Sequence, residues 1–464
     1  MAVRERAVRP SGASETGAPT LGLSAVVLAV AATVRRVVSG WVDSRRALWV
    51  AFVVTHGWLA LVGVVLMPRK AFFDLELYRT WVGAGLHGGS WPVLDAPFVY
   101  PVGALVPMLV PAVVSTTSTV AYALGWCLLV TGLDAIAVRA LARRGGARGA
   151  WWWLGFLFLL GPIAMGRLDA VVAPVVVVAL LAAATRPRVA AAALTAAAWV
   201  KVAPGVLLIP LVLIVRRPVR DVVVPAALVC AGVIGAVAAG GGLRFVTSFL
   251  TAQDSRGLQV EAVVATPWAL AALVRRDVWI VLNAELSTWE IVGPGTATAA
   301  RALDIVLPLA VAGLALLIWR ARHLSAPDRL IWGSLAMLTL LIVVNKVGSP
   351  QYIGWLAPPI AVALGTGRTG TRSDADVPPR ALPRLAGAVW GIAALTQVVF
   401  PFAYGRLLRS DVLITGVLAA RNVALVALLA GAIVVLARGA RIGEGVLASP
   451  LDDIPLHDDP AVRV

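Results

Sequence analysis

The sequence predicts an all-α, polytopic integral membrane protein. The chain has 464 residues, 60% of them hydrophobic, and a mean hydropathy of +0.88. A soluble domain of this length does not need so much apolar surface. The apolar residues form continuous runs instead of alternating with polar ones, which favours spanning helices over the strands of a barrel. We therefore expect about 12 spanning helices.

Charge and composition exclude several other classes of protein. The formal net charge is +16, but the Arg residues cluster in short loops between apolar runs, as they do where charge fixes membrane orientation. No nucleic-acid partner is therefore expected. Cys127 and Cys230 lie inside apolar runs and are expected to be core residues. The four histidines lack ligand spacing, so the sequence predicts neither a metal site nor a cofactor.

The first part of the chain predicts a cytoplasmic arm and two spans. Residues 1–20 are polar, and the apolar stretch 26–34 is too short to span and is expected at the membrane interface. We therefore expect 1–46 to form a disordered or interfacial arm, placed in the cytoplasm by Arg35, Arg36, Arg45 and Arg46. Spans are expected over 47–67 and 120–138. The outer loop between them, about 68–118, contains a short apolar segment at 102–114 that is expected to be half-buried.

Four unusually short apolar runs follow an Arg-rich inner loop at 139–148. They have 11 to 14 residues and cover 151–164, 171–184, 189–199 and 202–215. A perpendicular spanning helix needs ~20 residues. Two short hairpins would leave a cavity above their outer turns, which hold Arg167 and Asp169 in one case and Lys201 in the other. The alternative is ordinary spans whose ends carry snorkelling cations.

The remaining chain completes the expected membrane domain, 47–437. A span over 222–240 leads to a long outer region, whose middle at 260–274 is expected to form a helix lying on the outer face. Further spans are expected over 303–319, 330–344, 352–364, 385–402 and 412–436. The polar, basic loop 368–384 and the tail 438–464 are expected in the cytoplasm.

With this topology the unexpected polar residues gather on the outer side. They are Asp74, Glu76, Arg79, Asp95, Arg167, Asp169, Lys201, Arg256, Glu261 and Lys346. Lys and Arg can hold a lipid phosphate by charge-assisted hydrogen bonds, and a carboxylate can take a proton from an attacking hydroxyl. Transporters also carry such residues, but within their spans. Carboxylates in loops favour chemistry on a lipid at the membrane surface.

The densest polar stretch, 72–81, lies where the chain first leaves the membrane. It contains two carboxylates, an Arg and several aromatic residues. Ionisable groups at this position indicate a functional site. The alternative is a solvated loop anchored by interfacial Trp and Tyr.

Four motifs in this chain resemble one enzyme family. Asp-Leu-Glu-Leu-Tyr at 74–78, followed by Phe-Val-Tyr-Pro at 98–101, resembles the first-loop signature of actinobacterial polyprenyl-phosphate-mannose-dependent mannosyltransferases. Trp-Val-Lys-Val-Ala-Pro at 199–204 looks like the family's Lys-x-x-Pro turn. Arg-Gly-Leu-Gln-Val-Glu at 256–261 and Lys-Val-Gly-Ser-Pro-Gln-Tyr at 346–352 resemble two later loop motifs. The match covers roughly 47–365, in order.

The resemblance implies a GT-C-type glycosyltransferase, similar to glycosyltransferase family 87, with a catalytic first outer loop. It implies that Asp74 is the general base of an inverting transfer. The expected substrate-binding residues are Glu76, Tyr78, Arg79, Tyr100, Asp169, Lys201, Arg256, Gln259, Glu261, Lys346, Gln351 and Tyr352. Gln351 and Tyr352 stand where better-studied relatives carry His.

Four of these residues also have a simpler interpretation. Asp74 could cap a helix or pair with Arg79, and Glu76 could face water. Tyr78 and Tyr100 could be interfacial anchors.

The expected function is transfer of a hexosyl group, with mannosyl as the first choice, from a polyprenyl-phosphate sugar to a glycolipid or glycan acceptor. The expected place is the extracytoplasmic side of the plasma membrane, among membrane lipids. Three alternatives remain open: another polyprenyl-linked sugar, a transporter or flippase of a lipid-linked sugar, and an inactive relative that serves as a scaffold. The position of Asp74, in an outer loop or in mid-membrane, discriminates enzyme from transporter.

Overall fold

The structure, a computed structural model, describes residues 44–145, 147–251, 256–284, 286–366 and 381–447. Its contact pattern divides the chain into Met1–Ala47 and Leu48–Val464, and apart from the start of the first helix everything below concerns the second unit. Nearly all of the expected arm, 1–46, and most of the loop 368–384 and the tail 438–464 lie outside the described residues.

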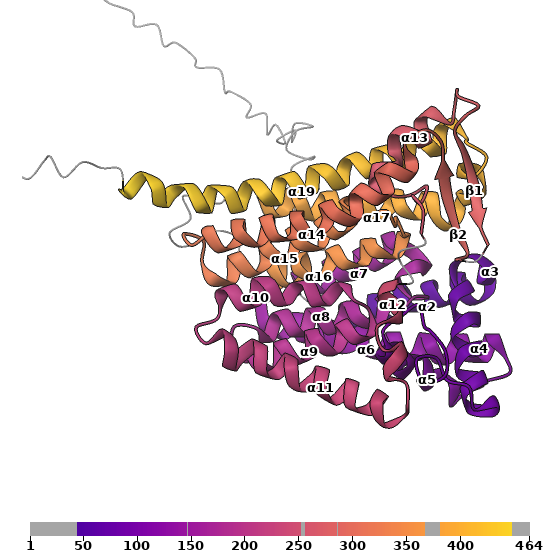
Figure 1. Cartoon of the computed structure of the whole chain (residues 1–464). Helices are drawn as coiled ribbons and strands as arrows, with labels where there is room; N and C mark the ends of the chain where they lie inside the picture. Colours follow the sequence, from indigo (N-terminus) through magenta and orange to yellow (C-terminus); the bar gives the residue numbers. More distant parts are fainter. Residues whose placement is uncertain (1–43, 146, 252–255, 285, 367–380, 448–464) are drawn as a thin grey trace, which may run out of the picture. The chain divides into compact units, whose positions relative to one another are not determined.

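Seven helices in the described part of the chain are long and apolar enough to cross a membrane. They are α2 (Arg45–Ala60) with η1 (Leu61–Leu66), α6 (Thr119–Gly145), η5 (Val219–Val223) with α11 (Val224–Ala239), α14 (Thr296–Arg320), α15 (Ala326–Val343), α17 (Ala381–Gln397) with η9 (Val398–Phe402), and α19 (Val412–Leu447). α14, α15 and α17 each pack against α19 and run beside it in Figure 1. These helices confirm the prediction of an all-α, polytopic membrane protein. α19 continues past residue 437, where the membrane domain was expected to end.

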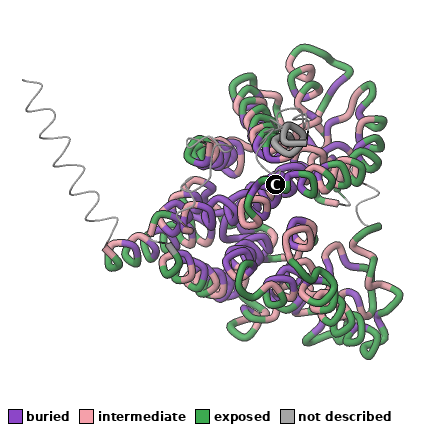
Figure 2. The backbone as a smooth tube through the Cα atoms, turned by 90° about the vertical axis from the view of Figure 1, so that its left-hand side faces the viewer, coloured by how far each residue is buried: buried purple, intermediate pink, exposed green. Residues whose placement is uncertain are grey.

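The four short apolar runs form short helices, as predicted. They are α7 (Arg148–Leu160), α8 (Asp169–Ala182), α9 (Pro187–Val200) and α10 (Leu208–Ile214), joined by η3 (Gly161–Ala164) and η4 (Ala203–Leu207). α8 packs against α6, α9 and α16 (Ala357–Gly365) and is buried along most of its length. In Figure 2 the buried residues, in purple, gather toward the middle of the view, and exposed residues, in green, lie mostly at its edges.

The short helices place polar residues at two opposite ends. α7 starts near an Arg-rich turn, where Arg144 donates to the carbonyl of Leu181, and it ends at the turn that holds Arg167. α9 likewise starts near Arg188, whose Nε lies 3.0 Å from Asp221 Oδ1, and ends at Lys201. The turns with Arg167 and Lys201 therefore share the end of the bundle opposite to these Arg-rich turns.

The segment after η1 forms the first loop layer at this end. It contains α3 (Pro68–Ala71), α4 (Phe73–Gly88), η2 (Val102–Ala104) and α5 (Leu105–Ala112), so the expected short apolar segment is a helix. The ring of Phe72, just before α4, occupies the space that a Cβ atom would need at both Gly63 and Gly166. This contact fixes the start of α4 against the turn that follows η3.

The second loop layer differs from the prediction. Its elements are η6 (Leu243–Phe245), α12 (Ser248–Thr251), η7 (Val263–Ala265), α13 (Thr266–Ala271) and an antiparallel hairpin of β1 (Trp279–Asn283) and β2 (Thr288–Val292). The helix expected over 260–274 is present but shorter, since η7 and α13 cover only 263–271. Pro267 lies in the first turn of α13, where a proline starts a helix but does not continue one. The sequence analysis also missed the hairpin, which lies near one end of α19 (Figure 1).

Candidate functional site

Asp74 faces a buried arginine. It lies in the first turn of α4, and its carboxylate forms an ion pair with Arg167, from the turn between η3 and α8. The hydroxyl of Tyr78, one helical turn on, donates to Asp74 Oδ2 at 3.5 Å. Asp74 is thus paired with a residue distant in sequence and not with Arg79, the partner considered from the sequence. Arg79 donates instead to Thr119 Oγ1 at 3.1 Å.

A second carboxylate, Asp169, lies two residues after Arg167. It is the first residue of α8 and only 3% exposed. Its Oδ1 accepts a hydrogen bond from Trp355 Nε1 at 2.6 Å, and its Oδ2 lies 3.5 Å from Lys201 Nζ. Lys201 directly follows α9, and its extended backbone ends the helix. Two cations and two carboxylates therefore meet at the ends of α8 and α9.

Burial and charge act differently on the two cations. Burial, the largest single effect, would lower the pKa of Lys201, but the Asp169 carboxylate together with Tyr100 and Tyr352 outweighs it, so that the pKa lies above its ordinary value. Burial lowers the pKa of Arg167 to about 10, although Asp169 opposes the change. Both side chains are positively charged at neutral pH.

Aromatic rings form the wall around Lys201. Its Nζ lies 4.9 Å from the ring centroid of Tyr100 and 5.6 Å from that of Tyr352, within cation–π range. Tyr78 packs edge-on against Tyr100 at 6.3 Å. Burial raises the pKa of Tyr352, and the positive charges of Lys201 and Arg256 oppose this rise. Arg256 therefore lies within electrostatic range of the same wall.

Some predicted site residues lie elsewhere. Glu76 is exposed on α4. The Nζ of Lys346 is 2.9 Å from Asp304 Oδ2, so this lysine has a carboxylate partner of its own. Gln351, by contrast, stays near Asp169: the two residues line the same small cavity, and Gln351 Oε1 accepts a hydrogen bond from Ser349 Oγ at 2.6 Å.

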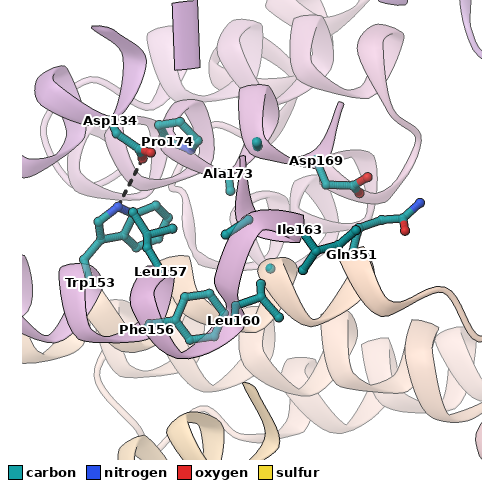
Figure 3. Close-up of a pocket in the computed structure, with 13 residues that line it drawn as sticks. Asp134, Trp153, Phe156, Leu157, Leu160, Ile163, Asp169, Ala173, Pro174 and Gln351 are labelled. Carbon is teal, nitrogen blue, oxygen red and sulfur yellow. Dashed lines mark hydrogen bonds between the residues drawn. The ribbon is translucent and has the colours of Figure 1, made fainter. Parts of the chain in front are cut away.

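A small cavity lies beside Asp169 (Figure 3). Its volume is about 20 Å³, and Asp169, Gln351, Asp134 and Trp153 supply its polar lining. Trp153 Nε1 donates to Asp134 at 3.1 Å, as the dashed line in Figure 3 shows. The cavity can hold a water molecule but not a sugar. A substrate would therefore have to approach Asp169 from the loop side.

The loops with Gln259 and Lys346 form one unit. The backbone N–H of Gln259 donates to the carbonyl of Lys346 at 3.0 Å, and the N–H of Gly348 donates to Gln259 Oε1 at 3.1 Å. Gly348 lies so close to the backbone of Glu261 and Ala262 that a Cβ atom would not fit there. Two of the resembling motifs are thus packed together.

Sequence reasoning missed Arg421, which anchors this unit. Arg421 is 2% exposed in α19, donates to the carbonyl of Glu261, and lies 3.9 Å from the Glu261 carboxylate. The next residue, Asn422, donates to Thr266 Oγ1 at 2.8 Å. The available signal was an Arg in the middle of an expected span, since charged residues there face protein partners or water.

Glu261 should make stability depend on pH. Burial raises its pKa from 4.5 to about 7, against the opposing effects of Arg421 and Tyr404. Between these two pKa values the folded protein holds a proton that the unfolded chain has lost. The free energy of unfolding therefore decreases as pH rises from about 5 to 7, by about 3 kcal/mol at most, and it does not recover at higher pH.

The measurement is the thermal unfolding temperature between pH 5 and 8. It should decrease with pH in the wild type, and Glu261→Gln should flatten the curve. The exposed Glu76→Gln is the matched control and should retain the slope. An unchanged slope in Glu261→Gln would assign the pH dependence to other groups.

The described residues contain no group of three His, Cys, Asp or Glu side chains that could hold a metal ion.

Comparisons with known proteins found one distant neighbour. No family model and no curated protein matches the chain. Among solved structures, ArnT from Cupriavidus metallidurans bound to undecaprenyl phosphate is similar, with 15% sequence identity and a TM-score of 0.42. The match covers 87% of this chain and 79% of that one. This likeness is too weak to transfer residues or activity to the present chain.

Proposed function

We propose that this protein is a GT-C-type glycosyltransferase that moves a hexosyl group, mannosyl in the first instance, from a polyprenyl-phosphate sugar to a glycolipid or glycan. The observation that carries the proposal is the set of Asp74, Arg167, Asp169 and Lys201, largely buried at the loop ends of apolar helices. A site of this kind offers a carboxylate that can take a proton from an acceptor hydroxyl. It also offers cations that can bind the phosphate of a lipid-linked donor, close to the lipid phase.

The proposed reaction is a single displacement. Asp74 takes the proton of an acceptor hydroxyl, whose oxygen forms a bond to the anomeric carbon of the donor. The bond between that carbon and the phosphate oxygen breaks, and its electron pair leaves with the polyprenyl phosphate. Lys201, Arg167 and Arg256 stabilise the charge that develops on the leaving phosphate, since fixed donors in a partly dry site act strongly there. Asp169 holds Lys201 in place.

The position of Asp74 favours an enzyme over a transporter. Asp74 lies in α4, and none of the candidate spans in the described chain includes this helix. Proton-carrying carboxylates of transporters lie within the spans. A carboxylate in a loop helix suits an acceptor that arrives from the aqueous side.

The reaction is expected on the extracytoplasmic side. Arg clusters at 139–148 and 216–220 should be cytoplasmic, and Asp74, Asp169, Gln259 and Lys346 should face the outside. In a background without Cys127 and Cys230, an impermeant thiol reagent should label Asp95→Cys but not Arg144→Cys in intact cells. The reverse pattern would overturn the orientation and the proposed membrane side.

The activity itself can be tested with purified protein. Polyprenyl-phosphate-mannose and a panel of membrane glycolipids should yield a mannosylated product and free polyprenyl phosphate. Other polyprenyl-phosphate sugars in the same assay define the sugar. If no donor reacts, while vesicles with the protein translocate a lipid-linked sugar, the protein is a transporter.

A further inference from the structure

Arg167 is a buried arginine with few partners. It is 7% exposed, and within the described part of the chain its Nε has no hydrogen-bond partner, while its Nη1 contacts Asp74 Oδ1. Its strong contact is the ion pair with Asp74. A guanidinium carries five N–H donors, and buried donors are nearly always satisfied. The side chain therefore retains unused capacity to bind an anion.

The fold fixes the backbone on both sides of this ion pair. Trp126 Nε1 donates to the carbonyl of Met165 at 2.8 Å, and Phe72 packs against Gly166. The hydroxyl of Tyr78 holds the other carboxylate oxygen of Asp74. If the pair opens, the flexible side chain of Arg167 has to move, since the two backbones are held.

Within the set of Asp74, Arg167, Asp169 and Lys201, two cations balance two carboxylates before a donor arrives. Arg167 and Lys201 face Asp74 and Asp169. A phosphate that enters beside Lys201 adds a negative charge and offers oxygens in the geometry that a guanidinium binds with two parallel hydrogen bonds. Asp74 and the phosphate would then compete for Arg167. A carboxylate held by a guanidinium accepts a proton less readily than a free one.

We propose that Arg167 switches partner during the reaction: it holds Asp74 in the empty site and moves to the donor phosphate when the donor binds. The switch frees Asp74 to act as a base only when a donor is present. It also places a second cation on the leaving phosphate. This role presupposes the proposed transfer from a polyprenyl-phosphate sugar.

The test is the affinity for undecaprenyl phosphate, measured by titration calorimetry on the purified full-length protein in detergent. Asp74→Asn should bind about tenfold more tightly than the wild type, because Arg167 has lost its competitor. Arg167→Met should bind about tenfold more weakly. In the double variant, Asp74→Asn should no longer tighten binding. Asp277→Asn, an exposed carboxylate that pairs with Arg275, controls for the loss of one negative charge and should leave the affinity unchanged.

The outcomes separate the switch from the proposed function. A wild type that does not bind the carrier lipid overturns both. A wild type that binds, with equal or weaker binding in Asp74→Asn, overturns the switch alone. Tightening that persists without Arg167 shows simple charge repulsion by Asp74 and also overturns the switch. If Arg167→Met does not fold, Arg167→Lys replaces it, and the tightening by Asp74→Asn should then be smaller, because lysine lacks the planar fork.

Discussion

Asp74→Asn is expected to lower sugar transfer by about 10²–10⁴-fold, the usual contribution of a positioned general base. Asparagine keeps the shape of the side chain and its place in the first turn of α4, but it cannot take the proton. Binding of the donor should persist, since the cations remain. The measurement is a single turnover with enzyme in excess, combined with a separate determination of donor affinity.

Glu76→Gln is the matched control for this prediction. It removes a carboxylate from the same helix, but Glu76 is exposed and outside the ion pairs. It should cost far less activity. Near-normal transfer by Asp74→Asn would assign the base to another carboxylate, with Asp169 and Glu261 the next candidates.

The second large effect is expected at Lys201. Loss of its ammonium group should weaken binding of the donor and of free polyprenyl phosphate by ~1.5–3 kcal/mol, the contribution of a hydrogen bond to a charged group. Affinity for the acceptor should barely change. However, Lys201→Ala also leaves Asp169 buried without its ion-pair partner, which can destabilise the fold by about 3–5 kcal/mol.

A double variant separates binding from stability. In Lys201→Met with Asp169→Asn, no unpaired charge stays buried, so the thermal unfolding temperature should recover while the affinity for polyprenyl phosphate stays low. Arg256→Ala and Lys346→Ala complete the series. Arg256 lies near Tyr352, whereas Lys346 is bound to Asp304, so the larger loss of affinity is expected for Arg256→Ala. Unchanged affinity in all three single variants would exclude Lys201, Arg256 and Lys346 from phosphate binding and reopen the transporter alternative.

The parts of the fold that follow from apolar runs could be predicted from the sequence. Run length alone indicated the short helices α7 to α9, and the turns between them placed Asp169 and Lys201 on one side. The hairpin was missed because its strands are short, although Trp279-Ile280-Val281 and Thr288-Trp289 are rich in the β-branched and aromatic residues typical of strands.

The pairings within the site could not be predicted in this way. Arg167 was expected near the outer surface, but its contact with Asp74 depends on how α4 packs against the turn before α8. Likewise, Arg421 meets Glu261 only because α19 packs against η7 and α13 of the second loop layer. Such contacts between distant segments are set by tertiary packing, which leaves no local pattern in the sequence.

The short helices have a consequence for the surrounding lipid. A helix such as α9, with 14 residues and one partly exposed side, is about 20 Å long, whereas the hydrocarbon core of a bilayer is ~30 Å thick. Where the ends of such helices lie near lipid, the bilayer has to become thinner or flanking Lys and Arg side chains have to reach up to the headgroups, each at a modest energetic cost. Transfer activity in vesicles should therefore vary with acyl-chain length, and a thin bilayer would bring a lipid phosphate to the level of Lys201 without lifting the carrier out of the membrane.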